Sequence, residues 1–176
     1  MSVINPQPTN TNFLQPTKFI LTFPRLTSTQ FFCQKVNLPG ISLDEIEQPT
    51  PFIEIHHPGD KLYHETLDVS FIVDEDLTTW LEIYEWIKGI TFPEDFDQYK
   101  GLKRLSPIAM NSKYPQFCDA QLNILTALNN TNLVAEFIDV FPVKLSSLEF
   151  DSTITDSPVM VAECTFRFTT YHVKKA

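Results

Sequence analysis

Glycine is scarce in this sequence, with four residues in 176. A loop that cradles phosphate, or a dinucleotide-binding turn, needs several glycines at fixed spacing so that backbone amides can approach the ligand. Here the glycines are scattered, and no Gly-x-Ser-x-Gly motif occurs. The sequence therefore predicts neither a nucleotide-binding loop nor a serine hydrolase.

Cysteine is rare as well. Cys33, Cys118 and Cys164 are odd in number and far apart, and each lies inside an apolar strand pattern. Such residues are typical of buried free thiols rather than of a disulfide framework. His172 follows Cys164 by eight residues, but it lies at the end of the expected strand. We expect no catalytic residue, no cofactor and no enzymatic activity.

The chain also lacks long apolar runs, and its basic residues are fewer than its acidic ones. No stretch of about 18 apolar residues is present, and the first ten residues do not have the layout of a signal peptide. We therefore expect synthesis in the host cytoplasm and no membrane partner. The 13 basic and 22 acidic residues give a net charge of −9.

The acidic residues are concentrated in one part of the chain. Between Asp44 and Asp97 there are fifteen acidic residues and two basic ones, whereas the rest of the chain has a net charge of +4. An acidic surface does not grip nucleic acid, but it could let a polyanion pass without binding. The alternative is that the acids only keep the surface soluble.

Aromatic residues, in contrast, are abundant. Fifteen Phe, five Tyr and two Trp predict a globular protein with an aromatic core, in one domain from residue 17 to residue 176. Residues 1–16 are polar with spaced prolines, which predicts a flexible arm that stays extended until a partner binds it.

A strand and a helix are predicted within LDVSFIVDEDLTTWLEIYEWIKG, residues 67–89. Apolar residues alternate over 67–73 as in a half-buried strand. Asp74 is placed as the N-cap of the helix and Gly89 as its C-terminal cap. The residues expected to face the core recur at helical spacing: Leu77, Trp80, Leu81, Tyr84 and Ile87.

Further strands are predicted over 17–23, 30–37, 117–128, 133–141, 143–150 and 159–173. Asn129 to Asn132 has the composition of a hairpin turn between two of them. Residues 92–107 show no periodicity and are expected to form a long surface excursion. The predicted fold is mainly β, with about eight strands and one helix.

Residues 42–65 form an acidic segment with three prolines, expected to be a loop or a long hairpin. Its apolar residues Phe52, Ile53 and Ile55 cannot tuck inward without burying Glu54, so the segment is a candidate contact surface. His56, His57 and His64 lie there among Glu54, Asp60 and Glu65, but no tight zinc spacing is present. We interpret these histidines as solvated loop residues and predict no metal site.

Three stretches together resemble the tail-tube family of contractile-tailed bacteriophages: TKFILTFP, QFFCQKVNLPGIS and HHPGDKLYHETLDVSFIVDEDLTTWLEIYEWI. The resemblance covers about the first hundred residues. Within it, the run FIVDEDL-x-x-W-x-x-x-Y-E-W is most similar to the members that complete and cap the tube. The repeating tube subunit and the initiator at the baseplate are alternatives from the same family.

The resemblance implies two packed antiparallel sheets in a barrel-like or sandwich-like arrangement, with one flanking helix. It also implies a homohexameric ring in the tail of the virion, whose strands line a channel. The partners would be other copies of the chain and tail tube, sheath or neck proteins, with DNA passing through without specific binding. Residues 42–65 would then reach a neighbouring subunit, with Pro51, Phe52, Ile53 and Ile55 as contact residues.

Asp68 and Glu163 are candidates for an acidic channel lining, because both fall on the polar side of their expected strands. Simple exposure to solvent is the competing interpretation. A protein of another class, a soluble β-barrel binding module with the histidine-rich segment at its mouth, also stays open.

Overall fold

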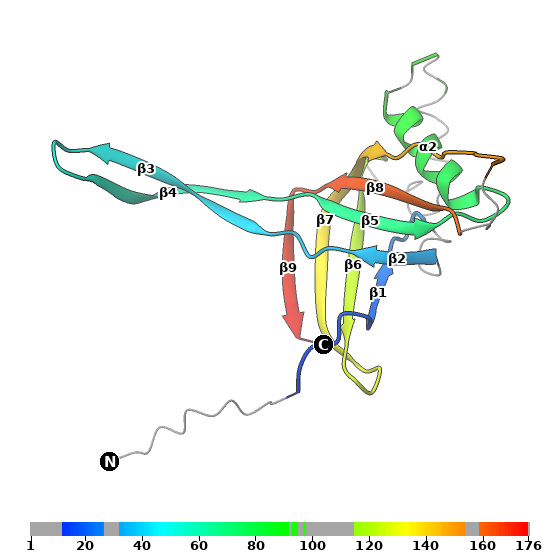
Figure 1. Ribbon diagram of the computed structural model, residues 1–176, viewed down its shortest axis with the longest axis horizontal. Helices are drawn as coiled ribbons and strands as arrows, with labels where there is room; N and C mark the ends of the chain where they lie inside the picture. Colours follow the sequence, from blue (N-terminus) through cyan, green and yellow to red (C-terminus); the bar gives the residue numbers. More distant parts are fainter. Residues whose placement is uncertain are drawn as a thin grey trace.

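The structure is a computed structural model that describes residues 12–26, 32–91, 93–94, 97, 115–153 and 159–175. It is mainly β with one long helix, as predicted, in a tapering body from which a hairpin projects (Figure 1). Residues 1–11 of the predicted flexible N-terminal segment, and most of the surface excursion predicted over 92–107, lie outside the described residues. The elements in chain order are β1 (Phe19–Thr22), β2 (Cys33–Val36), β3 (Ile41–Pro49), β4 (Glu54–His64), β5 (Leu67–Ile72), α2 (Thr78–Thr91), β6 (Cys118–Leu125), β7 (Thr131–Leu145), β8 (Val161–Arg167) and β9 (Thr170–Lys175).

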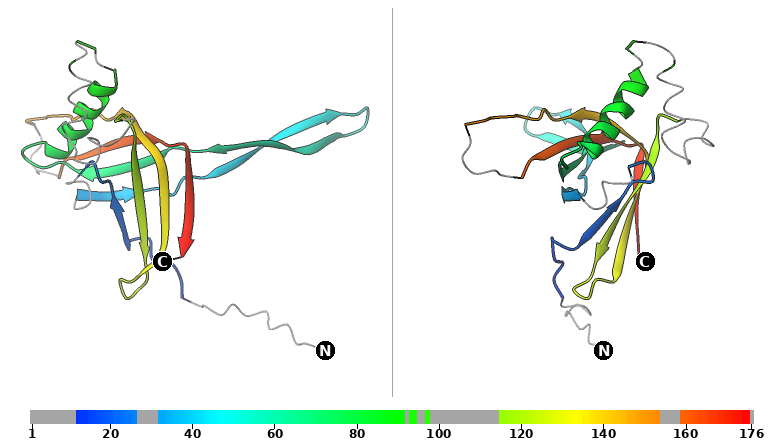
Figure 2. Two further views of the ribbon diagram at one scale, coloured as in Figure 1. Left: turned by 180° about the vertical axis from the view of Figure 1, so that it is seen from behind. Right: turned by 90° about the vertical axis from the view of Figure 1, so that its right-hand side faces the viewer.

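Two antiparallel sheets form the body, and they share β7. Sheet A has the strand order β1-β6-β7-β9, and sheet B has the order β2-β5-β8-β7. The strands of the two sheets run at a steep angle to each other (Figures 1 and 2). The predicted two-sheet architecture is confirmed. Within the described part of the chain it does not close into a barrel, because the end strands β1 and β2 are not paired with each other.

Strand β7 serves both sheets because it bends. Asp139 has a positive φ of 57°, and the register with β8 shifts between Pro142 and Lys144. Proline lacks the N–H that a ladder needs, so it is tolerated at such a shift. Prediction of a separate strand over 143–150 was therefore wrong: β7 continues to Leu145, and residues 146–150 are not in a strand.

The predicted strand over 159–173 is instead two strands. The chain turns at Phe168 and Thr169, so that β8 lies in sheet B and β9 in sheet A. The amide of Thr169 donates a hydrogen bond of 3.0 Å to the carbonyl of Ile138 at this corner. Phe168 packs there against Phe137, with ring centroids 5.2 Å apart. The packing of Phe168 on Phe137 therefore favours a corner here, although the apolar–polar alternation of the sequence continues through this point.

The core lies in the angle between the sheets and under the helix. Its largest buried side chains are Trp86, Phe71, Phe137, Phe166, Leu21, Leu26, Leu67, Ile83, Val69 and Val140. They come from both sheets, the helix and the segment after β1, so one apolar core holds the body together.

The face that helix α2 turns to the core only partly matches the predicted one: Trp80 and Ile87 pack against the core, but Leu81 and Tyr84 are exposed. Thr79, Ile83, Trp86 and Gly89 are the buried residues, whereas Leu81 is 42% exposed. Gly89 lies inside the last turn and has no positive φ, so the predicted C-cap is wrong. The helix is rotated because the large indole of Trp86 fills the corner between the sheets, against Phe166.

Asp74 caps the helix from a greater distance than predicted. The helix begins at Thr78, and Leu77, with a φ of 55°, precedes it. Hydrogen bonds from the Thr78 hydroxyl and from the Thr78 and Thr79 amides lower the pKa of the Asp74 carboxyl. Asp74 therefore satisfies free amides of the first turn across a short bend.

Candidate assembly surfaces

The hairpin β3–β4, here called the arm, forms a two-stranded sheet of its own and projects from the body (Figure 1). This decides between the loop and the long hairpin that the sequence left open. Its register shifts between the pairs Leu43–Leu62 and Glu45–Pro58, where β4 has three intervening residues against one in β3. An isolated two-stranded hairpin is at best marginally stable in water. The arm is therefore expected to need a partner surface.

The base of the arm is fixed to the body by several hydrogen bonds. The amide of Glu65 donates to the carbonyl of Gly40 (3.0 Å), and the amide of Gly40 donates to the Glu65 carboxylate (3.1 Å). A Cβ at Gly40 would lie 2.7 Å from that carboxylate, so a larger residue there would displace the Glu65 side chain from this hydrogen bond. The Tyr171 hydroxyl donates to the carbonyl of Pro39 (3.0 Å), which ties β9 to the arm.

The tip of the arm brings together the four residues that the sequence predicted as contacts. Pro51, Phe52 and Ile53 form the turn, and Ile55 follows on β4 opposite Gln48. The turn is closed by the amide of Thr50, which donates to the carbonyl of Ile53 (3.2 Å). Phe52 is 95% exposed, Ile53 66% and Ile55 39%. The tip is thus an apolar surface open to a partner, and its role as an intersubunit contact stays a prediction.

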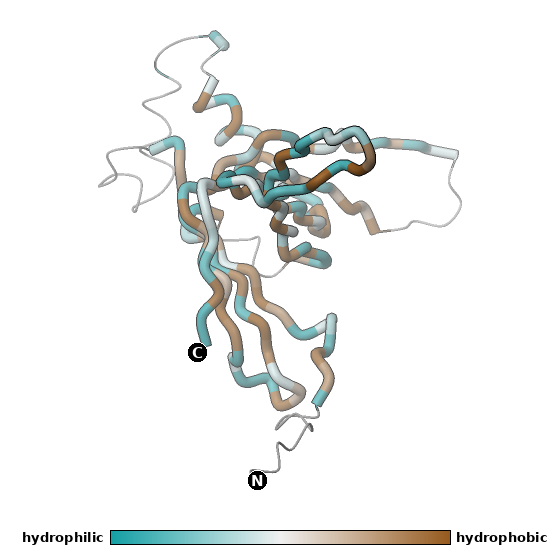
Figure 3. The backbone as a smooth tube through the Cα atoms, turned by 90° about the vertical axis from the view of Figure 1, so that its left-hand side faces the viewer, coloured by the Kyte–Doolittle hydropathy of each residue, from teal (hydrophilic) through white to brown (hydrophobic). Residues whose placement is uncertain are grey.

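Sequence reasoning missed that the apolar surface extends along the whole arm. Leu43 and Leu62 are paired across the strands near the base, and Ile46 lies further out; all three are exposed. The mixture of apolar and polar segments is visible when the arm is viewed end-on (Figure 3). Alternation of apolar residues at positions 41 and 43 was the available signal, but the acidic composition of the segment obscured it.

Strand pairing separates the three histidines of the arm. His56 lies opposite Glu47 and close to Glu45, and one ligand atom from each of these three lies within 4.8 Å of the others. His57 is on the other face of the arm, where its Nε2 lies 3.2 Å from the Gln48 side-chain oxygen. All of these side chains are exposed, and exposed carboxylates commonly occur without a metal. The absence of a metal site therefore stays a prediction.

His64 is at the base of the arm and belongs to an aromatic cluster. Its ring centroid lies 5.5 Å from that of Phe168 and 5.4 Å from that of Tyr171. These contacts place it well away from the distal histidines, at the junction with sheet A. A common histidine-rich mouth, as the binding-module alternative requires, is therefore not formed.

Asp68 and Glu163 lie on the same exposed face of sheet B. Strands β5 and β8 pair Asp68 with Thr165 and Ser70 with Glu163, so both carboxylates point away from the core. Asp68 accepts a hydrogen bond from the Thr165 hydroxyl (2.8 Å). The polar side of each strand is as predicted, but a channel-lining role for this face stays a prediction.

Basic residues that the sequence analysis did not connect with these acids share the face. Lys35 is paired with Ser70, Lys144 with Thr165, and Arg167 follows along β8. Residues in register on neighbouring strands project on the same side. The face therefore mixes both signs of charge rather than forming a purely acidic surface.

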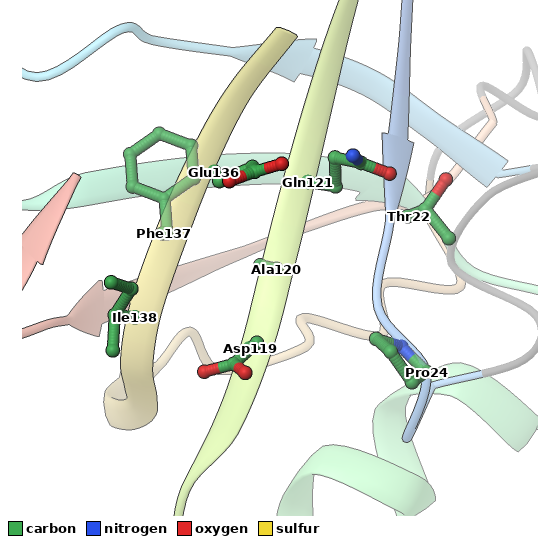
Figure 4. A pocket seen from close by; sticks show the side chains of 8 residues that line it. All are labelled: Thr22, Pro24, Asp119, Ala120, Gln121, Glu136, Phe137 and Ile138. Atoms are coloured by element: carbon green, nitrogen blue, oxygen red, sulfur yellow. The ribbon is translucent and has the colours of Figure 1, made fainter. Parts of the chain in front are cut away.

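In the part of the chain that the structure describes, a hollow on sheet A and the three thiols are the remaining places where chemistry could occur. Figure 4 shows a shallow hollow over sheet A that is lined by Thr22, Pro24, Asp119, Ala120, Gln121, Glu136, Phe137 and Ile138. Asp119 accepts from the Asp139 amide (3.1 Å), and Glu136 pairs with Lys174 (2.6 Å), so both acids of the hollow are engaged. The eight residues include no Ser, Cys, His or Lys.

Burial raises the pKa of all three thiols, that of Cys33 to about 11. A raised pKa disfavours the reactive thiolate. All three are free thiols, as predicted, but only Cys164 is buried; Cys33 and Cys118 are half-buried. Among the residues that the structure describes, no helix has the length and apolar character to cross a membrane.

The described fold thus consists of a two-sheet body, one long helix and an exposed arm. The family model described as "Phage tail tube protein" matches residues 12–174. The chain belongs to the phage tail tube protein family. That match covers both sheets, the helix and the arm, so the whole described fold is the fold of a tail tube protein.

Other comparisons agree with the tail tube family. The chain is 26% identical over 173 residues to the tail tube terminator protein of Enterobacteria phage T4, covering 93% of this chain and 90% of that protein. It matches the tube terminating cap of the anti-feeding prophage with a TM-score of 0.63 and 17% identity, over 100% of both chains. A chain of the sheath-tube complex of an extracellular contractile injection system gives 0.62 and 15%, over 94% of each. These structural likenesses establish the fold.

Proposed function

We propose that this protein is the terminator of a phage tail tube, a structural ring that caps the tube in the virion. The observation that carries the proposal is the sequence relative, a tail tube terminator aligned over nearly the full length of both chains. The family itself consists of tube proteins, in which a structural role rather than catalysis is expected. Like other virion proteins, it would be made in the host cytoplasm.

The terminator acts as a homohexamer, with the channel of the ring continuous with that of the tube. An arm that exposes apolar residues along its length supports assembly, because such a surface is stable only when another surface covers it. The partners are other copies of the chain, tail tube, sheath or neck proteins, and DNA in transit without specific binding. A sheath–tube complex among the structural likenesses supports the sheath as a partner.

Position on the tail tests the proposal. Tails from a phage that carries an epitope-tagged version of this chain should show antibody at one end of the tube only, in negative-stain electron micrographs. Loss of the gene should leave tubes without a defined end, and expression in trans should restore it. Label along the whole tube would instead identify the repeating subunit, and label at the baseplate would identify the initiator.

A further inference from the structure

The outer half of the arm, residues 44–58, is called the distal arm here. It carries four acidic residues, Asp44, Glu45, Glu47 and Glu54, and no basic residue. Three of these, Glu45, Glu47 and Glu54, alternate with apolar residues and share one face of the hairpin. The distal arm thus combines a negative face with an apolar tip.

An opposite surface exists elsewhere on the molecule, at the end of sheet A that holds the β6–β7 turn. This turn end comprises residues 12–18, 122–135 and 171–175, which include Lys18, Lys174 and Lys175 and no acidic residue. Lys174 pairs with Glu136 at its border (2.6 Å). Among the described residues, Lys18 donates to two uncharged oxygens, those of Ala127 (2.6 Å) and Asn129 (2.8 Å), which do not neutralise its positive charge.

The turn end is also apolar in part. Phe13 is 95% exposed, Leu128 82% and Val173 49%. Within the described residues, this is therefore a surface with exposed apolar side chains and positive charge, opposite in sign to the distal arm. Complementary charge selects partners and fixes their register, while burial of apolar area supplies affinity.

The distal arm cannot reach the turn end of its own chain. It projects at a steep angle to the strands of sheet A and away from them, as Figure 1 and the left-hand view of Figure 2 show. The contact must therefore join two molecules. Because the two surfaces differ, such a contact is head-to-tail, and repeated contacts of this kind close into a ring or continue as a stack.

We infer that the acidic distal arm of one copy docks on the basic turn end of sheet A of a second copy. This rests on the proposed ring and specifies its interface. In the contact, Glu45, Glu47 and Glu54 face Lys18, Lys174 and Lys175, and Phe52 covers the exposed apolar residues of the turn end. The contact is sensitive to salt, because both charged surfaces lie at the solvent boundary.

Two charge-reversed chains test the contact. The arm variant is Glu45→Lys, Glu47→Lys and Glu54→Lys; the end variant is Lys174→Glu and Lys175→Glu. Lys18 is left unchanged because it holds the β6–β7 turn. Glu75→Lys with Asp76→Lys, at exposed sites before the helix, is the control for net charge. Melting temperatures establish that each variant is folded.

Sedimentation velocity measures assembly of the purified chains at about 50 mM and about 500 mM salt. The wild type and the control should assemble alike, and more weakly at high salt. Each charge-reversed variant alone should assemble at least about tenfold more weakly, because attraction becomes repulsion. Mixed one to one, the two variants should assemble again, since every contact between unlike chains then joins opposite charges.

Three outcomes would overturn the inference: a wild type that stays monomeric, single variants that assemble like the wild type, or a mixture no better than its components. If sedimentation overturns the contact but the tagged protein is still found at the tube end on tails, the proposed function stays intact. If sedimentation supports the contact but the tagged protein lies elsewhere on the tail, the proposed function is contradicted and the inferred contact is retained.

Discussion

Trp86 is the side chain on which separate segments of the chain converge. The Arg25 guanidinium lies 4.8 Å from the centre of the indole ring and donates to the carbonyl of Pro115 (2.7 Å). The indole N–H donates to the carbonyl of Gln116 (3.0 Å). Burial lowers the pKa of Arg25 from a value far above neutrality. The helix, the end of β1 and the start of β6 are therefore held at one point.

The buried face of the helix gives the first prediction. Ile83→Asp should reduce the free energy of unfolding by about 3 to 5 kcal/mol, because it places an unpaired charge in the core. Leu81→Asp, on the exposed side, is the matched control and should cost less than about 1 kcal/mol. Urea unfolding followed by circular dichroism measures both. Equal losses would show that the helix packs on the face that the sequence pattern indicated.

The thiol of Cys33 gives a prediction about pH. Burial raises its pKa to about 11 from an ordinary value of 9.0, so the folded state holds this proton more tightly than the unfolded state. Stability from this group is fully present below pH 9.0 and should decline as the pH rises towards about 11. The comparison of wild type with Cys33→Ser isolates the effect from other titrations. An identical pH dependence of the two unfolding free energies would contradict it.

At the scale of elements, the tip of the arm gives the next prediction. Substitution of Phe52, Ile53 and Ile55 by Ser should leave the melting temperature nearly unchanged, because these side chains are exposed in the single chain. The same substitutions should abolish assembly on tails, because the apolar contact is lost. Thermal unfolding and electron microscopy of tails measure the two effects. Unfolding of the triple variant would identify the segment as part of the core.

Elements whose periodicity agrees with their environment could be predicted from the sequence. The strand at 67–72 alternates apolar and polar residues up to Phe71, with Ile72 as an exception, and lies in the sheet as expected; the turn at Asn129 joins β6 and β7. Errors arose where packing between distant segments decides. The corner at Phe168 depends on Phe137, and the rotation of the helix depends on the space that Trp86 fills between the sheets.

The candidate surfaces were only partly predictable for the same reason. An acidic segment with prolines indicated that Phe52 and Ile53 would be exposed, which is a local inference. The charge around Asp68 depends instead on Lys35 and Lys144, which come from other strands and meet it only through the sheet. Sequence alone gives no register between strands, so the mixed charge of this face could not be derived.

For the whole molecule, Asp68 and Glu163 give a prediction about DNA passage. If the proposed hexameric ring forms and sheet B lines its channel, each carboxylate is repeated six times around the ring. Asp68→Lys with Glu163→Lys should then slow DNA ejection and make it dependent on salt, since each added base strengthens contact with phosphate. Ejection rates at two salt concentrations measure this. An unchanged rate in a virion with intact tails would show that the face does not line the channel.

The shared strand β7 has a mechanical consequence. One continuous strand passes through both sheets, so its bend sets the angle between them, and the arm extends from sheet B. The 11 residues of β4 span about 36 Å at roughly 3.3 Å per residue, so a rotation of about 1° at the corner moves the tip by about 0.6 Å. In an assembled ring, a small tilt of one subunit would therefore displace the tip of its arm far enough to disturb close packing on the next subunit. The alignment of neighbouring subunits would then depend on the stiffness of the bend in β7.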